Sequence, residues 1–170
     1  MKFSELQVTE SYVDRDFSDL NRILLKLCKL IIKAQKLDSD KYGMVAACFI
    51  DADGQETYAV NYKRQSGKRI HAEHAALEKW QSKNGEAPAG GVIVTTLSPC
   101  SRPMNDRAGD DCTEILNNAG IKYVYCGYSD PTQDNSEQYA GRAFEINETS
   151  NKKLRKICKR FADTFLEKYK

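Results

Sequence analysis

The sequence has no long hydrophobic run, little at its N-terminal end that resembles a secretory signal, and almost no net charge. Because no apolar stretch reaches the roughly 18 residues that a membrane span needs, no transmembrane helix is expected. The N-terminal stretch MKFSELQVTESYVDRD lacks the apolar core of a secretory signal, so a cytoplasmic location is predicted. The 26 lysine and arginine residues nearly balance the 24 aspartate and glutamate residues. A membrane partner is therefore not expected, and nucleic acid is a partner that the composition does not favour.

Internal repeats, low-complexity tracts and linkers rich in proline, glycine or serine are also absent from the sequence. A length of 170 residues suits one hydrophobic core, so a single domain over residues 1–170 is predicted. Within it, residues 1–17 form an N-terminal extension to which the sequence assigns no role. Two basic segments, YKRQSGKR before His71 and NKKLRKICKR near the C-terminus, are expected to be solvated.

The six cysteines are expected to be reduced, because nothing in the sequence directs the chain to an oxidising compartment. Four of them lie in apolar segments and are predicted to pack in the core: Cys28, Cys48, Cys126 and Cys158. Cys100 and Cys112 differ from these four, because both lie in polar segments rich in turn-forming residues. An oxidised protein with disulfides is the alternative, and it would have neither free thiols nor a metal site.

Hydrophobic periodicity predicts helices that alternate with strands. Residues 17–37 and 150–170 carry apolar side chains at helical spacing, which predicts two amphipathic helices. Two strands on either side of the turn ADGQ should form a hairpin, and the helix that contains His71 should end near Gly85. The other predicted elements are a strand at 90–100, a helix at 110–120, a strand at 121–130 and a candidate edge strand at 142–148.

Strands separated by helices are typical of a layered α/β fold with crossover connections. The two hairpin strands should pair antiparallel, and parallel pairing is expected later in the chain. The strand within residues 90–100 is apolar almost throughout, which indicates that helices cover both faces of the sheet. We therefore predict an α/β fold of three layers with a mixed central sheet.

Three polar clusters stand at predicted ends of strands or starts of helices. They are HAE at the start of one helix, SPC at the end of a strand and DDC at the start of the next helix. Such ends meet at one edge of a layered α/β fold, where ligands usually bind. One imidazole and two thiolates, from His71, Cys100 and Cys112, suit a zinc ion that keeps a fourth position for water. Glu73 could act as the base beside that water.

The spacing of His71 and Glu73 needs a geometric check. Side chains two residues apart point to different faces in the middle of a helix, but at the first turn both can reach forward to the same point. Taken alone, His71 and Glu73 would be interpreted as the polar start of a surface helix. When Cys100 and Cys112 are considered with them, a metal site is the better interpretation. His74 is expected to pack or to support a ligand, and the spacing does not fit the metalloprotease motif, which has two histidines four residues apart.

This pattern, His-x-Glu followed by Pro-Cys and a second cysteine, resembles the zinc-dependent cytidine and deoxycytidylate deaminase superfamily. The run TTLSPCSRP, the AGI before the strand at 121–130 and the DP after it look most like the pyrimidine deaminase of riboflavin biosynthesis. The resemblance covers about residues 43–131 and the helix before them. One departure is the spacing, since eleven residues separate Cys100 from Cys112, whereas most of the superfamily has Pro-Cys-x-x-Cys.

The resemblance implies a cytidine-deaminase-like fold that holds one zinc ion through His71, Cys100 and Cys112. It implies that Glu73 moves protons between water and the substrate ring. It also implies that an asparagine after the second strand, here Asn61, holds the base, and that the chain can form homo-oligomers. Two further substrate contacts are expected from position alone: Tyr128 at the end of a strand, and Arg102 or Arg107 in the loop between the two cysteines.

The predicted function is a zinc-dependent hydrolase acting on C–N bonds. It would convert an exocyclic amine of a pyrimidine-like base, nucleoside or nucleotide, or of the aminopyrimidine of riboflavin biosynthesis, to a carbonyl with release of ammonia. A polynucleotide cytosine or adenine deaminase is one alternative, favoured if the basic C-terminal helix flanks the pocket. A non-catalytic, zinc-stabilised binding module of the same fold is the other alternative.

Overall fold

A computed structural model describes residues 16–100, 112–130 and 142–168 of the chain. The elements are α2 (Phe17–Leu37), β1 (Tyr42–Ile50), β2 (Glu56–Lys63), β3 (Arg69–Ile70), α3 (Ala72–Asn84), β4 (Val92–Leu97), α4 (Cys112–Asn118), β5 (Tyr123–Tyr128), β6 (Glu145–Glu148) and α5 (Lys152–Lys168). Every element expected from the sequence is present. The short strand β3 was not expected, and the candidate edge strand is confirmed as β6.

The six strands form one mixed sheet in the order β3-β2-β1-β4-β5-β6. β1 pairs antiparallel with both β2 and β4, whereas β4, β5 and β6 are mutually parallel. The predicted change from antiparallel to parallel pairing is therefore confirmed. β4 lies in the centre of the sheet and all six of its residues are buried, as its continuous apolar sequence predicted.

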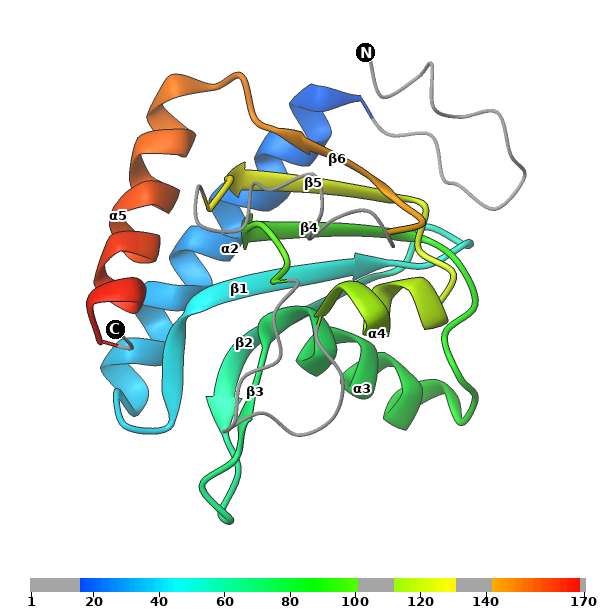
Figure 1. Cartoon of the computed structure of the whole chain (residues 1–170), viewed down its shortest axis with the longest axis horizontal. Helices are drawn as coiled ribbons and strands as arrows, with labels where there is room; N and C mark the ends of the chain where they lie inside the picture. The colour runs from blue at the N-terminus through cyan, green and yellow to red at the C-terminus, as the bar shows by residue number, and fades with distance from the viewer. Residues whose placement is uncertain (1–15, 101–111, 131–141, 169–170) are drawn as a thin grey trace.

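Helices cover both faces of this sheet, which confirms the predicted three-layer α/β fold (Figure 1). α2 packs on one face, while α3 and α4 pack on the other. α5 lies beside α2 and contacts β1, β4 and β5 near the ends at which β4 and β5 stop. Because α3 begins and β4 ends on the same side of the sheet, polar residues at these termini can meet there.

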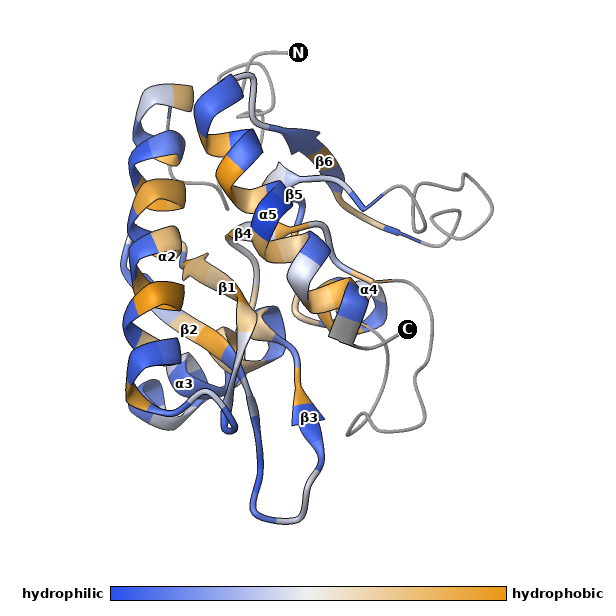
Figure 2. Ribbon diagram, turned by 90° about the vertical axis from the view of Figure 1, so that its left-hand side faces the viewer, coloured by the Kyte–Doolittle hydropathy of each residue, from blue (hydrophilic) through white to orange (hydrophobic). Residues whose placement is uncertain are grey.

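α2 shows how the sequence pattern produces this packing. Asp16 caps the helix, since its side chain accepts a hydrogen bond of 2.8 Å from the backbone N–H of Asp19. Its apolar residues recur every three or four positions and are buried against the sheet, while its hydrophilic residues face outward (Figure 2). The buried residues are Leu20, Ile23, Leu24, Leu27, Cys28, Ile31 and Ala34.

α3 is held to the sheet by a buried polar anchor. Trp80 Nε1 donates a hydrogen bond of 2.9 Å to Asp51 Oδ2, and the Trp80 ring contacts the edge of Phe49 at a centroid distance of 5.7 Å. The other carboxylate oxygen of Asp51 accepts two backbone N–H bonds of 2.9 Å in the turn after β1, from Asp53 and Gln55. One carboxylate thus joins the hairpin turn to the helix that begins at the candidate metal centre.

The cysteines and the membrane expectation can also be compared with the fold. All six cysteines lie within the described residues and none of them forms a disulfide. The four that were predicted to pack in the core are buried: Cys28, Cys48, Cys126 and Cys158.

Within the described residues, no helix combines the length and the apolar composition that crossing a bilayer requires.

The substitution Asp51→Ala should lower the free energy of unfolding by about 2–3 kcal/mol, because it leaves the buried Trp80 N–H and two turn N–H groups without their acceptor. Denaturant unfolding measures this effect. Asp53→Ala is the matched control, since Asp53 is an exposed carboxylate in the same turn, and it should change stability by less than about 0.5 kcal/mol. Equal effects of the two substitutions would show that Asp51 is not the anchor described above.

Candidate metal centre

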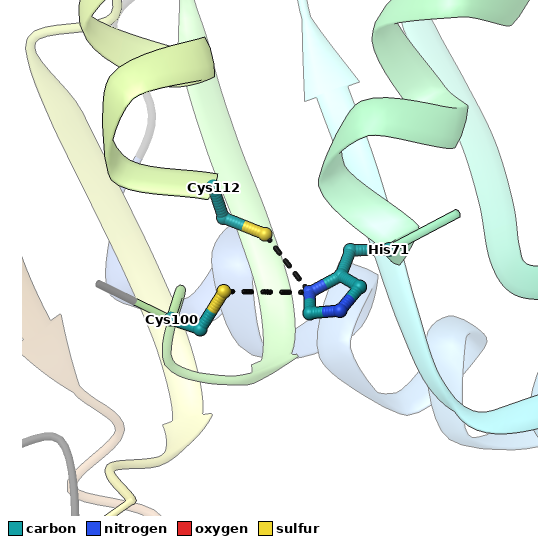
Figure 3. A group of neighbouring side chains, drawn as sticks. All are labelled: His71, Cys100 and Cys112. Carbon is teal, nitrogen blue, oxygen red and sulfur yellow. Dashed lines mark hydrogen bonds between the residues drawn. The ribbon is translucent and has the colours of Figure 1, made fainter. Parts of the chain in front are cut away.

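Three separate elements bring one imidazole and two thiols together at the end of β4. His71 immediately precedes α3, Cys100 follows β4, and Cys112 is the first residue of α4. His71 Nδ1 lies 3.5 Å from Cys100 Sγ and 3.0 Å from Cys112 Sγ, and both sulfur atoms point toward the same ring nitrogen (Figure 3). The convergence that the sequence predicted is therefore present.

The donor set fits a tetrahedral zinc ion. The three ligand atoms all lie within 4.8 Å of one another. With zinc bonds of about 2.0 Å to nitrogen and 2.3 Å to sulfur, tetrahedral ligands are separated by roughly 3.5–3.8 Å. The observed separations are close to these values, so only small side-chain adjustments are needed to hold a metal. Cys112 is buried, while His71 and Cys100 are partly exposed, which leaves one side of the cluster accessible.

Backbone contacts fix the two cysteines relative to each other. The N–H and the hydroxyl of Thr113 both donate to the carbonyl oxygen of Cys100, each at 3.1 Å. The segment that leads to Cys100 is tied to β5, because Ser98 N–H donates to the Tyr128 carbonyl oxygen at 2.9 Å. The Ser98 hydroxyl oxygen in turn accepts from Asp130 N–H at 2.8 Å. The positions of both sulfur atoms are thus set by the sheet.

The surroundings of Cys100 favour its thiolate. A hydrogen bond with Cys112 contributes most, and a hydrogen bond and the charge of His71 add to it, so the pKa of Cys100 lies well below that of an ordinary thiol. Burial opposes this shift. Because the thiolate is the form that binds metals, the cluster is prepared for a cation.

Glu73 lies beside this cluster and is almost fully buried, with 3% of its surface exposed. Its Oε2 is 3.9 Å from Cys112 Sγ, and its Oε1 accepts a hydrogen bond of 3.3 Å from the Thr95 hydroxyl. Burial raises the pKa of Glu73 to about 7, although the nearby His71 charge lowers it. A bound dication would lower this pKa further. His71 stands at the N-cap of α3 and Glu73 in its first turn, and both side chains reach the cluster as expected.

His74 lies apart from the three possible ligands. Its Nε2 is 3.5 Å from Glu78 Oε1 one helical turn further on, and burial lowers the pKa of His74. Glu78 also pairs with Arg64 and accepts a hydrogen bond of 3.1 Å from the Tyr62 hydroxyl. His74 is therefore part of a polar network that joins α3 to the end of β2.

Asn61 lies on β2, close to the chain segment that contains His71. The pairing of β2 with β3 joins Tyr62 to Ile70, and continuing this register places Asn61 opposite His71. The Asn61 Oδ1 accepts a hydrogen bond of 3.0 Å from Val45 N–H. A side chain at Gly43 would collide with Asn61, so this glycine leaves the space that the amide occupies.

Of the other residues expected to contact the substrate, the structure describes Tyr128 but not the two arginines. Tyr128 ends β5 and is buried, and it belongs to the same apolar cluster as Ala72 and Leu97. Two cations of α5 lie over its ring, with Arg155 Cζ at 5.2 Å and Lys159 Nζ at 5.8 Å from the centroid. Arg102 and Arg107 lie outside the described residues, so their predicted contacts stay predictions.

Sequence reasoning missed two residues that support the centre, Thr95 and Thr113. Thr95 had a visible signal, because it and Thr96 are the two polar residues of a buried and otherwise apolar central strand. Thr113 directly follows a candidate ligand, but its hydrogen bond to the Cys100 carbonyl joins residues thirteen positions apart and depends on tertiary folding. No sequence pattern reports such a contact.

The fold and the cluster together define a class of protein, an α/β protein with a three-residue metal site of the catalytic type. Residues 21–128, more than half of the chain, match the family model described as the cytidine and deoxycytidylate deaminase zinc-binding region. The chain belongs to this family of zinc-binding deaminases. The resemblance drawn from its motifs, and the expectation of zinc as cofactor, are therefore confirmed.

The individual relatives share less than a quarter of their aligned residues with this chain. The diaminohydroxyphosphoribosylamino-pyrimidine deaminase of Schizosaccharomyces pombe is 24% identical over 106 residues, which cover 62% of this chain and 25% of that protein. The deaminase/reductase structure from Thermotoga maritima has a TM-score of 0.56 at 23% identity, covering 84% of this chain and 42% of the other. Acinetobacter baumannii RibD gives 0.59 at 17% identity, with 88% and 40% covered. The chain thus spans less than half of each of these relatives, and the two structures support the fold alone.

Removal of zinc should lower the melting temperature by roughly 10 °C, because a lost metal ion leaves the buried thiolates and Glu73 without a counter-charge. Thermal unfolding with and without a chelator measures the shift. Cys112→Ala should not respond to the chelator, whereas Cys126→Ala, which changes a buried cysteine of β5, should respond as the wild type does. An unchanged transition in wild-type protein shown to be free of metal would contradict the site.

Proposed function

We propose that this chain is a zinc-dependent hydrolytic deaminase of an aminated, pyrimidine-like ring. The observation that carries this proposal is the buried carboxylate of Glu73 beside a partly accessible cluster of His71, Cys100 and Cys112. A structural zinc site needs four protein ligands and no neighbouring base, whereas the residues that the structure describes offer three ligands and a carboxylate at this cluster. A non-catalytic binding module gives no reason to bury that carboxylate.

Zinc held by the three ligands would supply a Lewis acid that makes water acidic enough to attack the ring. Glu73 would accept the proton of the attacking water and deliver it to the ring nitrogen beside the amine-bearing carbon. It would then help to protonate the departing amine. Water is consumed, a carbonyl replaces the C–N bond, and ammonia leaves. The hydrogen bond from Thr95 would hold the carboxylate in the orientation that these transfers require.

The substrate class proposed is a small nucleobase-like molecule, as a base, nucleoside, nucleotide or phosphoribosylated aminopyrimidine. The name of the Schizosaccharomyces pombe relative supports the last of these. Asn61 is proposed to hold the base, because the strand register sets it across from His71. Tyr128 and Arg102 are proposed as further contacts. A single domain, a homo-oligomeric state and a cytoplasmic location stay predictions.

A polynucleotide substrate is the second candidate, and the position of α5 favours it. Cys158 and Ala162 of this basic helix belong to the same apolar cluster as Ala72, which follows His71, and Leu97, which ends β4. The helix therefore flanks the region of the proposed pocket, which is the condition under which the sequence favoured polynucleotide deamination.

Glu73→Gln should lower turnover by about a factor of 1,000 while zinc content and melting temperature stay close to those of the wild type, because the amide keeps the shape but cannot move protons. Mass spectrometry of amine-to-carbonyl conversion measures turnover over bases, nucleosides, nucleotides, the riboflavin-pathway aminopyrimidine and short oligonucleotides. Glu78→Gln is the matched control on the same helix and should retain activity.

Either of two results would contradict the proposal. One is retained turnover in a Glu73→Gln protein that holds zinc. The other is no conversion of any compound in this panel by zinc-loaded wild-type protein, which would favour the binding module.

A further inference from the structure

The two amphipathic helices α2 and α5 carry a large share of the positive charge of the chain. Together they contain twelve lysine and arginine residues against three aspartate and glutamate residues, a net charge of +9. The rest of the chain contains fourteen basic and twenty-one acidic residues, a net charge of −7. The near-neutral composition thus conceals a strong separation of charge.

The fold places these two helices side by side. Cys28 of α2 and Cys158 of α5 are in contact, with their sulfur atoms 3.7 Å apart, and Leu154 of α5 joins the core cluster of α2. Figure 2 shows α2 and α5 next to each other. We call the exposed cations of both helices the basic face: Arg22, Lys26, Lys29, Lys33, Lys36, Lys152, Lys153, Arg155, Lys156, Lys159 and Arg160.

Most of these cations are not neutralised by the rest of the described chain. Ion pairs with described residues involve Arg22, Arg155 and Lys159. Lys26 lies over the ring of Tyr58 instead. The others form no ion pair with a described residue: Lys29, Lys33, Lys36, Lys152, Lys153, Lys156 and Arg160. Cations four residues apart, such as Lys152, Lys156 and Arg160, follow each other at intervals of about 6 Å along the helix.

The distribution of apolar residues indicates which polyanion this face suits. A helix that binds a membrane surface inserts a broad apolar face into the bilayer, but the apolar faces of α2 and α5 already pack against the sheet. The exposed aliphatic residues of α2 are Leu25, Ile32 and, at its last position, Leu37, and they are interspersed with lysines. A symmetric dimer through this face is also disfavoured, because the basic faces of the two copies would repel each other.

We propose that the basic face of α2 and α5 binds the sugar-phosphate backbone of a nucleic acid strand, for which single-stranded RNA serves as the probe. Rows of lysine and arginine that follow a sugar-phosphate chain release its counterions, which is the main source of sequence-independent affinity for nucleic acid. The inference rests on the charge distribution and not on the proposed deamination. α5 also flanks the proposed pocket, so a strand bound to this face would lie near the metal centre.

The test compares the binding of a fluorescein-labelled single-stranded RNA, by fluorescence anisotropy over a range of salt concentrations, between two variants of equal net charge. The face variant carries Lys29→Glu, Lys33→Glu, Lys153→Glu and Lys156→Glu. The control variant changes four exposed lysines elsewhere on the chain: Lys63→Glu, Lys68→Glu, Lys83→Glu and Lys122→Glu. Melting temperature and zinc content show that both variants are folded.

The wild type should bind RNA with an affinity that falls steeply with salt, and the face variant should bind about tenfold or more weakly. Each lost phosphate contact should also reduce the slope of log affinity against log salt by about 0.7. The control variant should lose much less affinity and keep the slope. Glu73→Gln should bind as the wild type does, so the failure of one proposal can be told from the failure of the other.

Three results would overturn the inference. The first is no binding of RNA by the wild type at low salt. The second is an equal loss of affinity in the face and control variants, because net charge alone would then explain the binding. The third is tighter binding to polyglutamate or to vesicles containing phosphatidylserine than to RNA, which would assign the face to an acidic protein or to a membrane.

Discussion

The meeting of His71, Cys100 and Cys112 is the constraint on which the rest of the molecule depends. Each residue stands at the border of a different element, so the sulfur and nitrogen atoms converge only if α3, β4 and α4 are all correctly placed. The buried strand β4 sets the position of Cys100, and Thr113 ties the start of α4 to it. Trp80 and Asp51 fix α3 to the hairpin at the far end of the helix.

The electrostatics of the centre connect folding to chemistry. Two thiols and the carboxylate of Glu73 are gathered in a region largely removed from water, where unbalanced negative charge is costly. Burial raises the pKa of Glu73, whereas hydrogen bonds lower the pKa of Cys100 against the opposing effect of burial. A dication at the cluster would favour the charged form of both groups. An ion that stabilised the fold would therefore also keep Glu73 ionised and ready to accept a proton.

Much of this arrangement could be predicted from the sequence, because it follows from short-range patterns. The apolar period of α2, the continuous run of β4 and the glycine at the end of α3 each report a local preference for helix or strand. The three candidate ligands could be predicted as a set because zinc chemistry restricts the residue types that can bind the ion. β3 was not predicted, because a strand of two residues is too short to show an alternating hydrophobic pattern. The role of Thr113 was not predicted, because its contact with Cys100 depends on tertiary folding. The expected contact of Asn61 with a base, and those of Tyr128 and Arg102, stay predictions, because pocket residues are selected by a ligand and not by local structure.

The charge pattern illustrates a different limit. The sequence showed a basic C-terminal segment whose ordinary interpretation is a solvated helix face, and its overall charge argued against nucleic acid. Only the fold shows that α5 lies against α2, which is also basic. The lysine and arginine residues of the two helices therefore form one basic surface. A property that arises from the sum of two distant segments cannot be read from either segment alone.

X-ray absorption at the zinc edge tests the metal centre most directly, because it counts the ligand types around the ion. We expect sulfur ligands at about 2.3 Å and nitrogen or oxygen ligands at about 2.0 Å in equal numbers, the latter from His71 and a solvent molecule. The sulfur contribution should fall by half in the Cys112→Ala protein if any zinc remains. Four sulfur ligands, or a shell of nitrogen and oxygen alone, would contradict the centre described here.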